Sequence, residues 1–299
     1  MTNLAWYARN LFLVDRNRKW WQSGLSVGIK AGYYQRIAAS YLRMGVTGRK
    51  RIQYLGRRFE FDNPATPLNL QVYPYEVSCQ ILQHVASPRS VATVLDLGGN
   101  LGQFSATLKH LLPQAEVDVF EPNPHVLPFL QRNTADFEGV RIFPYALAPR
   151  TDSGEDNGAS LFFEPNRSCT GSLIAENVGH LVELVEVPIA TVPDPVALTG
   201  RSAYDLVKID VEGFELDVVS CLRGISMRYL FLEFSTRARS KSYLHSEMFA
   251  VLREQFGEFD ILAQDACGSG VNNFDVMIEF APAAAEVSVP RGRQAAETP

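Results

Sequence analysis

The sequence has few cysteines and no long hydrophobic run, and these two absences exclude several classes of protein. Its 299 residues include four cysteines, which lie far apart and form no C-x-x-C pair. That spacing argues against a zinc ribbon and against a disulfide scaffold. No run of about eighteen apolar residues occurs, and charged residues interrupt the N-terminus where a signal peptide needs an apolar core. We therefore expect a cytoplasmic protein.

Positive charge is scarce after residue 60 and abundant before it. Residues 1–60 contain twelve basic and two acidic residues, whereas the remainder contains sixteen basic and thirty-one acidic ones. The net charge of −5 therefore combines about +10 in the first part with about −15 in the second. Such a basic segment favours an anionic partner, which could be a membrane surface, a nucleic acid or a phosphorylated substrate.

Residues 1–60 also contain many aromatic residues, and we interpret them as a mostly helical extension. Apolar residues recur at intervals of four at Leu25, Ile29, Tyr33, Ile37 and Tyr41, which predicts one helix with an apolar stripe. The stripe could pack on the main domain. Residues 1–45 could instead make peripheral contact with an anionic membrane, where tryptophan, tyrosine and basic residues are favoured. A nucleic acid is less expected, because no known nucleic-acid-binding motif is visible.

A glycine-rich turn follows a short apolar run at residues 94–97 and precedes helical spacing of apolar residues up to Leu112. Gly98, Gly99 and Gly102 let the backbone turn tightly and approach a ligand closely. A second apolar strand ends at Glu121, where an acid can accept hydrogen bonds from both hydroxyls of a ribose. The pattern predicts half of a nucleoside-binding site, although a tight strand-to-helix connection without function would also use these glycines.

Strands and helices alternate along the chain from residue 94 onward, which indicates a mostly parallel sheet covered by helices. Residues 272–280 alternate like a closing edge strand with an antiparallel neighbour. We place one α/β domain at residues 61–280. The tail at residues 281–299 is rich in alanine, proline and charge, so we expect it to be disordered.

A second motif, DLVKIDVEGFE at residues 205–215, places three carboxylates at the end of a buried strand. They belong to Asp210, Glu212 and Glu215. In open α/β sheets this edge is where ligands bind, and crowded acids raise each other's pKa, which suits a proton acceptor. Glu212 and Glu215 could alternatively be acids that complement the dipole at the start of a helix.

With both motifs in view, the chain resembles the FkbM-type family of class I S-adenosylmethionine-dependent methyltransferases. The resemblance covers roughly residues 91–233. The turn DLGGNLG matches the family turn except that Gly99 replaces an alanine, the Glu-Pro-Asn-Pro at residues 121–124 is intact, and KIDVEGFE at residues 208–215 matches a long family motif. The implied fold is α/β and Rossmann-like: a doubly wound, mostly parallel seven-stranded sheet with an antiparallel edge strand, plus the helical N-terminal extension.

The resemblance also implies roles for individual residues. Asp210 and Glu212 would line the acceptor side as candidate catalytic residues, and Glu233 is a weaker candidate there. Glu121 would hold the ribose hydroxyls, Asn123 would lie near the adenine, and Ala146 sits where the family's loop passes the adenine. The remaining cofactor-binding candidates shape the methionine and ribose pocket: Asp96, Gly98, Gly99, Asn100 and Gly102.

The implied activity is O-methylation with S-adenosyl-L-methionine as methyl donor. The acceptor would be a hydroxyl group, commonly of a sugar in a polysaccharide, glycolipid or natural product, and a lipid-linked acceptor would suit the basic N-terminus. Asp210 or Glu212 is the expected general base, with His180 or His245 as outside candidates. We expect no metal, because the sequence offers no clear third ligand beside Asp210 and Glu212.

Other classes of protein remain open from the sequence. A nicotinamide dehydrogenase is disfavoured by the incomplete glycine pattern and the acidic second motif. A nucleic-acid methyltransferase would use the basic segment, but the Asn/Asp-Pro-Pro-aromatic motif for base nitrogens is absent after the fourth strand. A non-catalytic protein that kept the nucleotide-binding fold is a further alternative.

Overall fold

A computed structural model describes residues 50–61, 76–149, 159–164, 167–172, 185–189, 191–235, 245–267 and 273–281. The predicted N-terminal helix, the tail beyond residue 281 and His180 lie outside these residues. Among the described residues, no helix is long and apolar enough to span a membrane.

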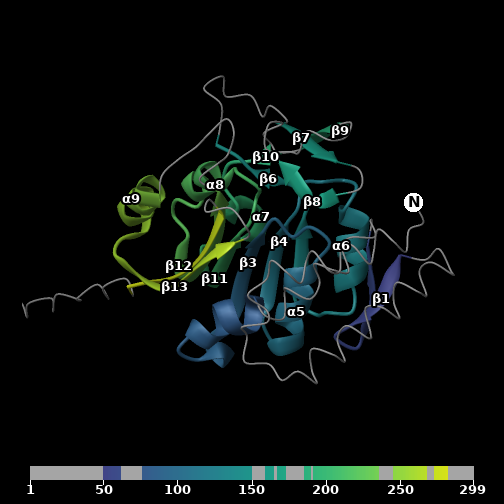
Figure 1. Cartoon of the computed structure of the whole chain (residues 1–299), viewed down its shortest axis with the longest axis horizontal. Coiled ribbons are helices and arrows are strands. Elements are labelled where there is room, and N and C mark those ends of the chain that lie inside the picture. The colour runs from purple at the N-terminus through teal and green to yellow at the C-terminus, as the bar shows by residue number, and fades with distance from the viewer. Residues whose placement is uncertain are drawn as a thin grey trace, which may run out of the picture.

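A seven-stranded sheet forms the centre of the molecule (Figure 1), in the order β13-β14-β12-β11-β3-β4-β5. Its strands are β3 (Thr93–Leu97), β4 (Glu116–Phe120), β5 (Val140–Phe143), β11 (Ala203–Ile209), β12 (Ser226–Ser235), β13 (Phe259–Cys267) and β14 (Asn273–Phe280). The chain order reverses between β3 and β11. In such sheets the ligand lies at this switch point, outside the carboxyl ends of the strands.

The antiparallel strand is β14, but its place differs from the sequence prediction. We expected an antiparallel strand at the edge, whereas β14 lies between β12 and β13, and β13 is the edge strand. β14 pairs antiparallel with both neighbours. β13 and β14 are consecutive in the chain and pair with each other, and the later strand, β14, also pairs with β12, so β13 is left at the edge.

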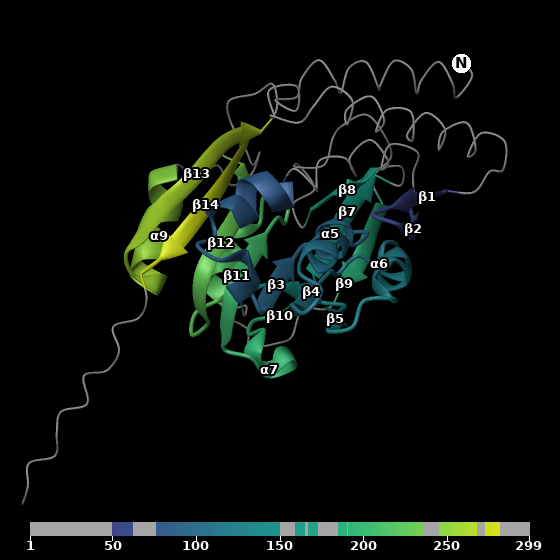
Figure 2. The ribbon, with the colours of Figure 1, turned by 90° about the horizontal axis from the view of Figure 1, so that it is seen from below.

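Helices cover both faces of the sheet, as Figure 2 shows. α5 (Gln103–Leu111) and α6 (Leu127–Thr134) lie on one face with the helical turns η2 (Glu76–Ile81), η3 (Leu82–His84) and η4 (Pro88–Ser90) nearby. The other face carries α7 (Val196–Thr199), α8 (Glu215–Cys221) and α9 (His245–Phe256). Alternating residues of the buried strands supply the two cores: Leu206 packs toward α5, whereas Val207 packs toward α8. The predicted doubly wound fold is confirmed.

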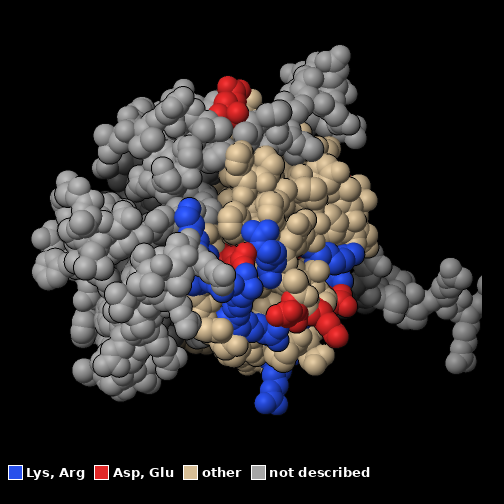
Figure 3. All heavy atoms as spheres, turned by 90° about the vertical axis from the view of Figure 1, so that its right-hand side faces the viewer, with Lys and Arg blue, Asp and Glu red and all other residues tan. Residues whose placement is uncertain are grey.

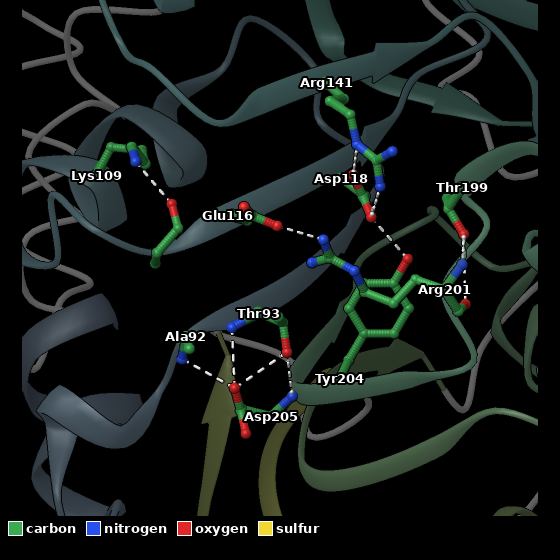
Figure 4. A network of polar contacts seen from close by, with 11 residues as sticks. Ala92, Thr93, Lys109, Glu116, Asp118, Arg141, Thr199, Arg201, Tyr204 and Asp205 are labelled. Carbon is green, nitrogen blue, oxygen red and sulfur yellow. Dashed lines mark hydrogen bonds and ion pairs between the residues drawn. The ribbon is translucent and has the colours of Figure 1, made fainter.

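A polar network holds the amino-terminal ends of the central strands together (Figure 4). Asp205 Oδ2 accepts hydrogen bonds from the backbone N–H groups of Ala92 and Thr93, at 2.8 and 2.9 Å. Buried Asp118 binds Arg141 through two hydrogen bonds and accepts a third from the Tyr204 hydroxyl at 2.8 Å. Because these bonds link β3, β4, β5 and β11, they fix the register of the strands whose opposite ends carry the candidate site.

Two smaller sheets follow β5, at the carboxyl end of the central sheet (Figure 1). β6 (Ala146–Leu147) pairs parallel with β10 (Thr191–Val192). β7 (Ala159–Glu164) pairs antiparallel with both β8 (Arg167–Ser172) and β9 (Val185–Ile189). The segment between β6 and β10 is therefore an insertion beside the edge where a ligand of this fold binds.

The first described residues form a hairpin of β1 (Arg51–Tyr54) and β2 (Arg57–Glu60). The sequence placed these residues in the N-terminal extension. Tyr54, Phe59 and Phe61 are buried in a third core with residues from α5 and from the segments before α5 and α6. The hairpin thus packs as part of the α/β domain.

Candidate functional site

The glycine-rich turn brings the carboxyl ends of β3 and β11 into contact. Gly98 has a φ of +89°, and a Cβ atom at this position would lie 1.9 Å from the carbonyl oxygen of Asp210. The backbone N–H of Asp210 donates to the Leu97 carbonyl at 3.1 Å. The two sequence motifs, more than 100 residues apart, therefore meet at the switch point of the sheet.

The rest of the turn lies tightly against β4. A Cβ atom on Gly99 would lie 2.2 Å from Cγ1 of Val119, so a side chain there would push the turn away from the sheet. Asn100 has a φ of +47°, an uncommon conformation for a residue with a side chain. α5 begins at Gln103 with no side chain capping its first backbone N–H groups.

Glu121 directly follows β4 and points its carboxylate at the same turn. Its Oε2 accepts the backbone N–H of Asn100 at 2.7 Å, and its Oε1 accepts that of Asn123 at 2.8 Å. Each carboxylate oxygen has a second lone pair, so Glu121 can still accept two hydroxyl donors. Burial raises the pKa of the Glu121 carboxyl to about 7, against the lowering effect of these two backbone bonds.

Lys208 is a buried side chain that contacts both halves of the site, the β3 side and the β11 side. It is buried on β11, and its Nζ lies 3.1 Å from Asp210 Oδ2 and 3.5 Å from Asp96 Oδ1. Asp96 is fully buried and accepts a hydrogen bond of 2.5 Å from the Ser105 hydroxyl. Burial raises the pKa of the Asp96 carboxyl, and Lys208 and Ser105 oppose that rise. Asp96 therefore supports the site from inside the core.

The role of Lys208 was missed from the sequence, where it appeared only as part of a motif. A detectable signal was present, because a lysine in an otherwise apolar buried strand needs a buried partner. Its two partners lie on either side of the switch point, at Asp96 on β3 and Asp210 after β11.

The three acids of the second motif have different environments. The Asp210 side chain is 23% exposed and is held by Lys208. Glu212 is exposed and has a φ of +53°. Partial exclusion of water by the neighbouring protein atoms, together with repulsion from Asp210 and Glu215, raises the pKa of its carboxyl. Glu215 is buried and accepts the backbone N–H of Gly213 at 2.6 Å, so it holds the turn at the start of α8.

Asn123 and Ala146 lie near the carboxyl ends of β4 and β5, at the same edge of the sheet as Glu121. Asn123 is buried, and its Oδ1 accepts the backbone N–H of His125 at 2.9 Å, which shapes the turn after Glu121. Glu121 N–H donates to the carbonyl of Phe143, the last residue of β5, at 3.1 Å. Ala146 is buried three residues beyond Phe143, in β6.

Glu233 and His245 are the further candidates from the sequence. Glu233 lies near the carboxyl end of β12, opposite Asp275 of β14. His245 begins α9, and its side chain is outside the described part of the structure. Within the described residues, no group of three histidine, cysteine, aspartate or glutamate side chains is arranged to hold a metal ion.

The site has the polar groups that a nucleoside with a charged tail requires. Glu121 offers acceptors for a ribose, while Asp210 and Glu212 provide carboxylates across the switch point. These two sides share one backbone junction at Gly98 and Asp210. Such an arrangement can hold a nucleoside cofactor on one side and a proton-donating acceptor on the other.

Comparisons with known proteins agree with this geometry. The family model described as the methyltransferase FkbM domain matches residues 96–259. Methyltransferase 1 of Beauveria bassiana is 26% identical over 227 residues, which cover 65% of this chain and 87% of that protein. The 2-O-methyltransferase NoeI of Sinorhizobium fredii is 26% identical over 202 residues, covering 63% and 80%. Aeropyrum pernix fibrillarin, solved with S-adenosyl-L-methionine, is 13% identical with a TM-score of 0.42, covering 78% of this chain and 83% of that one.

Proposed function

The chain belongs to the FkbM methyltransferase family and uses S-adenosylmethionine, and from this premise we propose that it methylates a hydroxyl oxygen. The observation that carries the proposal is the contact between the glycine-rich turn and the acidic end of β11 at Gly98 and Asp210. An acceptor bound beside Asp210 and Glu212 would lie next to the cofactor half of the site. The relative named 2-O-methyltransferase NoeI supports oxygen as the methylated atom.

Glu121 holds the ribose hydroxyls in this proposal, and the turn from Gly98 to Gly102 forms the wall beside the rest of the cofactor. S-adenosylmethionine, when bound, supplies a methyl group on a sulfonium. The enzyme's contribution is to align the acceptor oxygen with that methyl group, because positioning alone can supply much of the rate.

The acceptor hydroxyl must also lose its proton, and two carboxylates are candidates to receive it. Asp210 is held in place by Lys208, which gives it a defined orientation. The pKa of the Glu212 carboxyl is raised above its ordinary value, so its ionised form is a stronger proton acceptor than an ordinary carboxylate. We assign Asp210 as the base nearest the junction and Glu212 as the alternative.

The proposed acceptor is a sugar hydroxyl in a polysaccharide, glycolipid or natural product. A lipid-linked saccharide would suit the basic and aromatic residues 1–45, which we propose contact the inner face of an anionic membrane from the cytoplasm. A nucleic-acid acceptor is the second candidate, favoured by the same basic charge.

The test uses S-adenosylmethionine with an isotopically labelled methyl group, incubated with glycolipid, polysaccharide and RNA fractions. We expect a labelled methyl ether on a sugar in the saccharide fractions. Asp210→Asn should lower turnover by at least about 100-fold because it removes a general base. Glu212→Gln is the parallel variant, and unchanged binding of S-adenosylhomocysteine controls for folding.

Full turnover by Asp210→Asn would remove Asp210 as the base. In that case, loss of turnover in Glu212→Gln would transfer the role to Glu212. Labelled RNA without labelled saccharide would replace the sugar acceptor with a nucleic acid.

A further inference from the structure

Asn133 of α6 joins three segments of the chain that are far apart in sequence. Its Oδ1 accepts the backbone N–H of Glu60 at 2.7 Å, and its Nδ2 donates to the Glu60 carbonyl at 2.8 Å. The same Nδ2 donates to the Leu101 carbonyl at 2.8 Å. The side chain is buried, so all three bonds are shielded from water.

Leu101 belongs to the glycine-rich turn, between Asn100 and Gly102. Asn133 therefore ties the end of the β1–β2 hairpin directly to the turn that forms one wall of the cofactor site. Its functional relevance follows from this position and could not be read from the sequence, because its partners precede it by 32 and 73 residues.

The hairpin supports the same turn through packing. Leu101 is fully buried in a core with Tyr54, Phe59 and Phe61 of the hairpin region. Val126, which follows the segment from Glu121 to Asn123, is in the same core. The Tyr54 hydroxyl also lies 2.6 Å from Thr107 Oγ1 of α5. One element thus backs both the turn and the segment after Glu121.

The turn needs such outside support. Asn100 has a left-handed backbone conformation, which persists only when surrounding structure holds it. α5 has no side-chain cap at its start. Backbone bonds from Gly102 N–H to the Gly99 carbonyl (2.8 Å) and from Ala106 N–H to the Gly102 carbonyl (2.9 Å) close the turn locally, and the bond from Asn133 to Leu101 adds to them from outside. Ligand binding is tighter when the protein groups are already in the bound geometry, because less ordering is lost on association.

We propose that Asn133 is a positioning residue for cofactor binding and that the β1–β2 hairpin is the element through which it acts. The hairpin and Asn133 keep the turn from Gly98 to Gly102 in the conformation that accepts S-adenosylmethionine. Because linkage between two equilibria is reciprocal, cofactor binding must in turn stabilise the docking of the hairpin.

The first test compares two full-length variants by calorimetric titration with S-adenosylhomocysteine. Asn133→Ala removes the two bonds to Glu60 and the bond to Leu101. We expect the Kd to rise about tenfold, because only the bond to Leu101 acts on the turn directly and a tenfold change matches the free energy of about one buried hydrogen bond. Tyr204→Phe is the control. It removes the buried hydrogen bond of 2.8 Å from the Tyr204 hydroxyl to Asp118 at the opposite end of the sheet and leaves the hairpin and the Leu101 carbonyl bonded, so its Kd should stay within about twofold of the parent.

Melting temperatures separate positioning from general stability. Asn133→Ala loses three buried hydrogen bonds and Tyr204→Phe loses one, so both should melt at lower temperature, but only Asn133→Ala should also bind the ligand more weakly. An Asn133→Ala variant that melts lower yet keeps the parental Kd would overturn the proposal.

A second measurement uses the unmodified protein and therefore does not depend on a variant that folds. Amide hydrogen exchange of residues 50–61 should slow when S-adenosylhomocysteine is added, as reciprocal stabilisation requires. Exchange in the hairpin that is the same with and without the ligand would contradict the coupling, even if binding itself is normal.

Discussion

At the scale of single residues, the pKa of Glu121 links cofactor binding to pH. In the cofactor-free protein, burial raises this pKa from 4.5 to about 7. The folded state then holds the proton more tightly than the unfolded state, so the contribution of Glu121 to stability declines as pH rises from about 4.5 to about 7. Cofactor affinity depends on pH in the opposite direction and should increase as pH rises, because the ionised carboxylate is the better acceptor for two ribose hydroxyls.

We therefore expect affinity for S-adenosylhomocysteine to fall as pH decreases through about 7. At about pH 6 the Kd should be roughly tenfold higher than at about pH 8, measured by titration calorimetry. Glu121→Gln is the matched control: it should bind more weakly throughout and lack this component of the pH dependence. A parent and a variant with identical pH profiles would disprove the assignment of Glu121 to the ribose.

Candidate residues could be identified from the sequence where a short segment contains them together. The glycines, Glu121 and Asp210 each belong to a local motif, and the structure brings them to the same edge of the sheet. Lys208 and Asn133 differ, because their importance depends on partners that reach them only after folding. A motif lists residue types along the chain, whereas a buried hydrogen bond depends on which segments pack together.

At the scale of elements, the end of β11 lies so close to the glycine-rich turn that no side chain fits at Gly98. Gly98→Ala should lower the free energy of unfolding by about 3 kcal/mol, from backbone strain at positive φ and from the clash with the Asp210 carbonyl. Gly224→Ala provides the comparison, since Gly224 has a similar φ of +90° but nothing within 4 Å of an added Cβ atom. Its cost should be about 1 kcal/mol, from strain alone.

Urea denaturation of both variants measures the difference, and titration with S-adenosylhomocysteine shows whether the turn still works. Gly98→Ala should also lose cofactor binding, because the turn must move away from β11. Equal destabilisation of the two variants would mean that the close approach of Asp210 does not constrain this turn.

Elements of the central sheet could be predicted well from apolar periodicity. Residues 94–97 became β3, residues 117–121 correspond to β4, and the strand before Asp210 became β11. The hairpin was less accessible, because β1 has only four residues, too few for its alternation of polar and apolar residues to stand out beside the basic segment before it. The place of β14 was also missed, since strand order depends on which edge is open when the last hairpin forms.

At the scale of the whole molecule, the face that holds β1 and α6 carries several basic side chains. Figure 3 shows Lys and Arg side chains on the face that holds β1 and α6, with acidic side chains among them. Arg58 and Arg132 there pair with Glu60, and Arg57 pairs with Asp136. Because these pairs reduce the net charge of the face, the basic residues 1–45 are the stronger candidate for an anionic membrane.

We expect the full chain to sediment with anionic liposomes and a chain lacking residues 1–45 to remain in the supernatant. Neutral liposomes and added salt should reduce sedimentation of the full chain, because exposed charges are screened. The shortened chain must still bind S-adenosylhomocysteine, which shows that the domain remains folded. Equal sedimentation of the two forms would exclude residues 1–45 as the membrane contact.

The sequence by itself determined the class of the fold, the methyl donor and the acids at the ends of β4 and β11. These depend on local periodicity and on motifs whose residues are close together in the chain. Only the tertiary structure decided that Gly98 contacts Asp210, that Lys208 lies between two acids, and that the hairpin supports the glycine-rich turn. The physical reason is that burial, close approach and hydrogen bonding are properties of segments brought together by packing, which the order of residues alone does not specify.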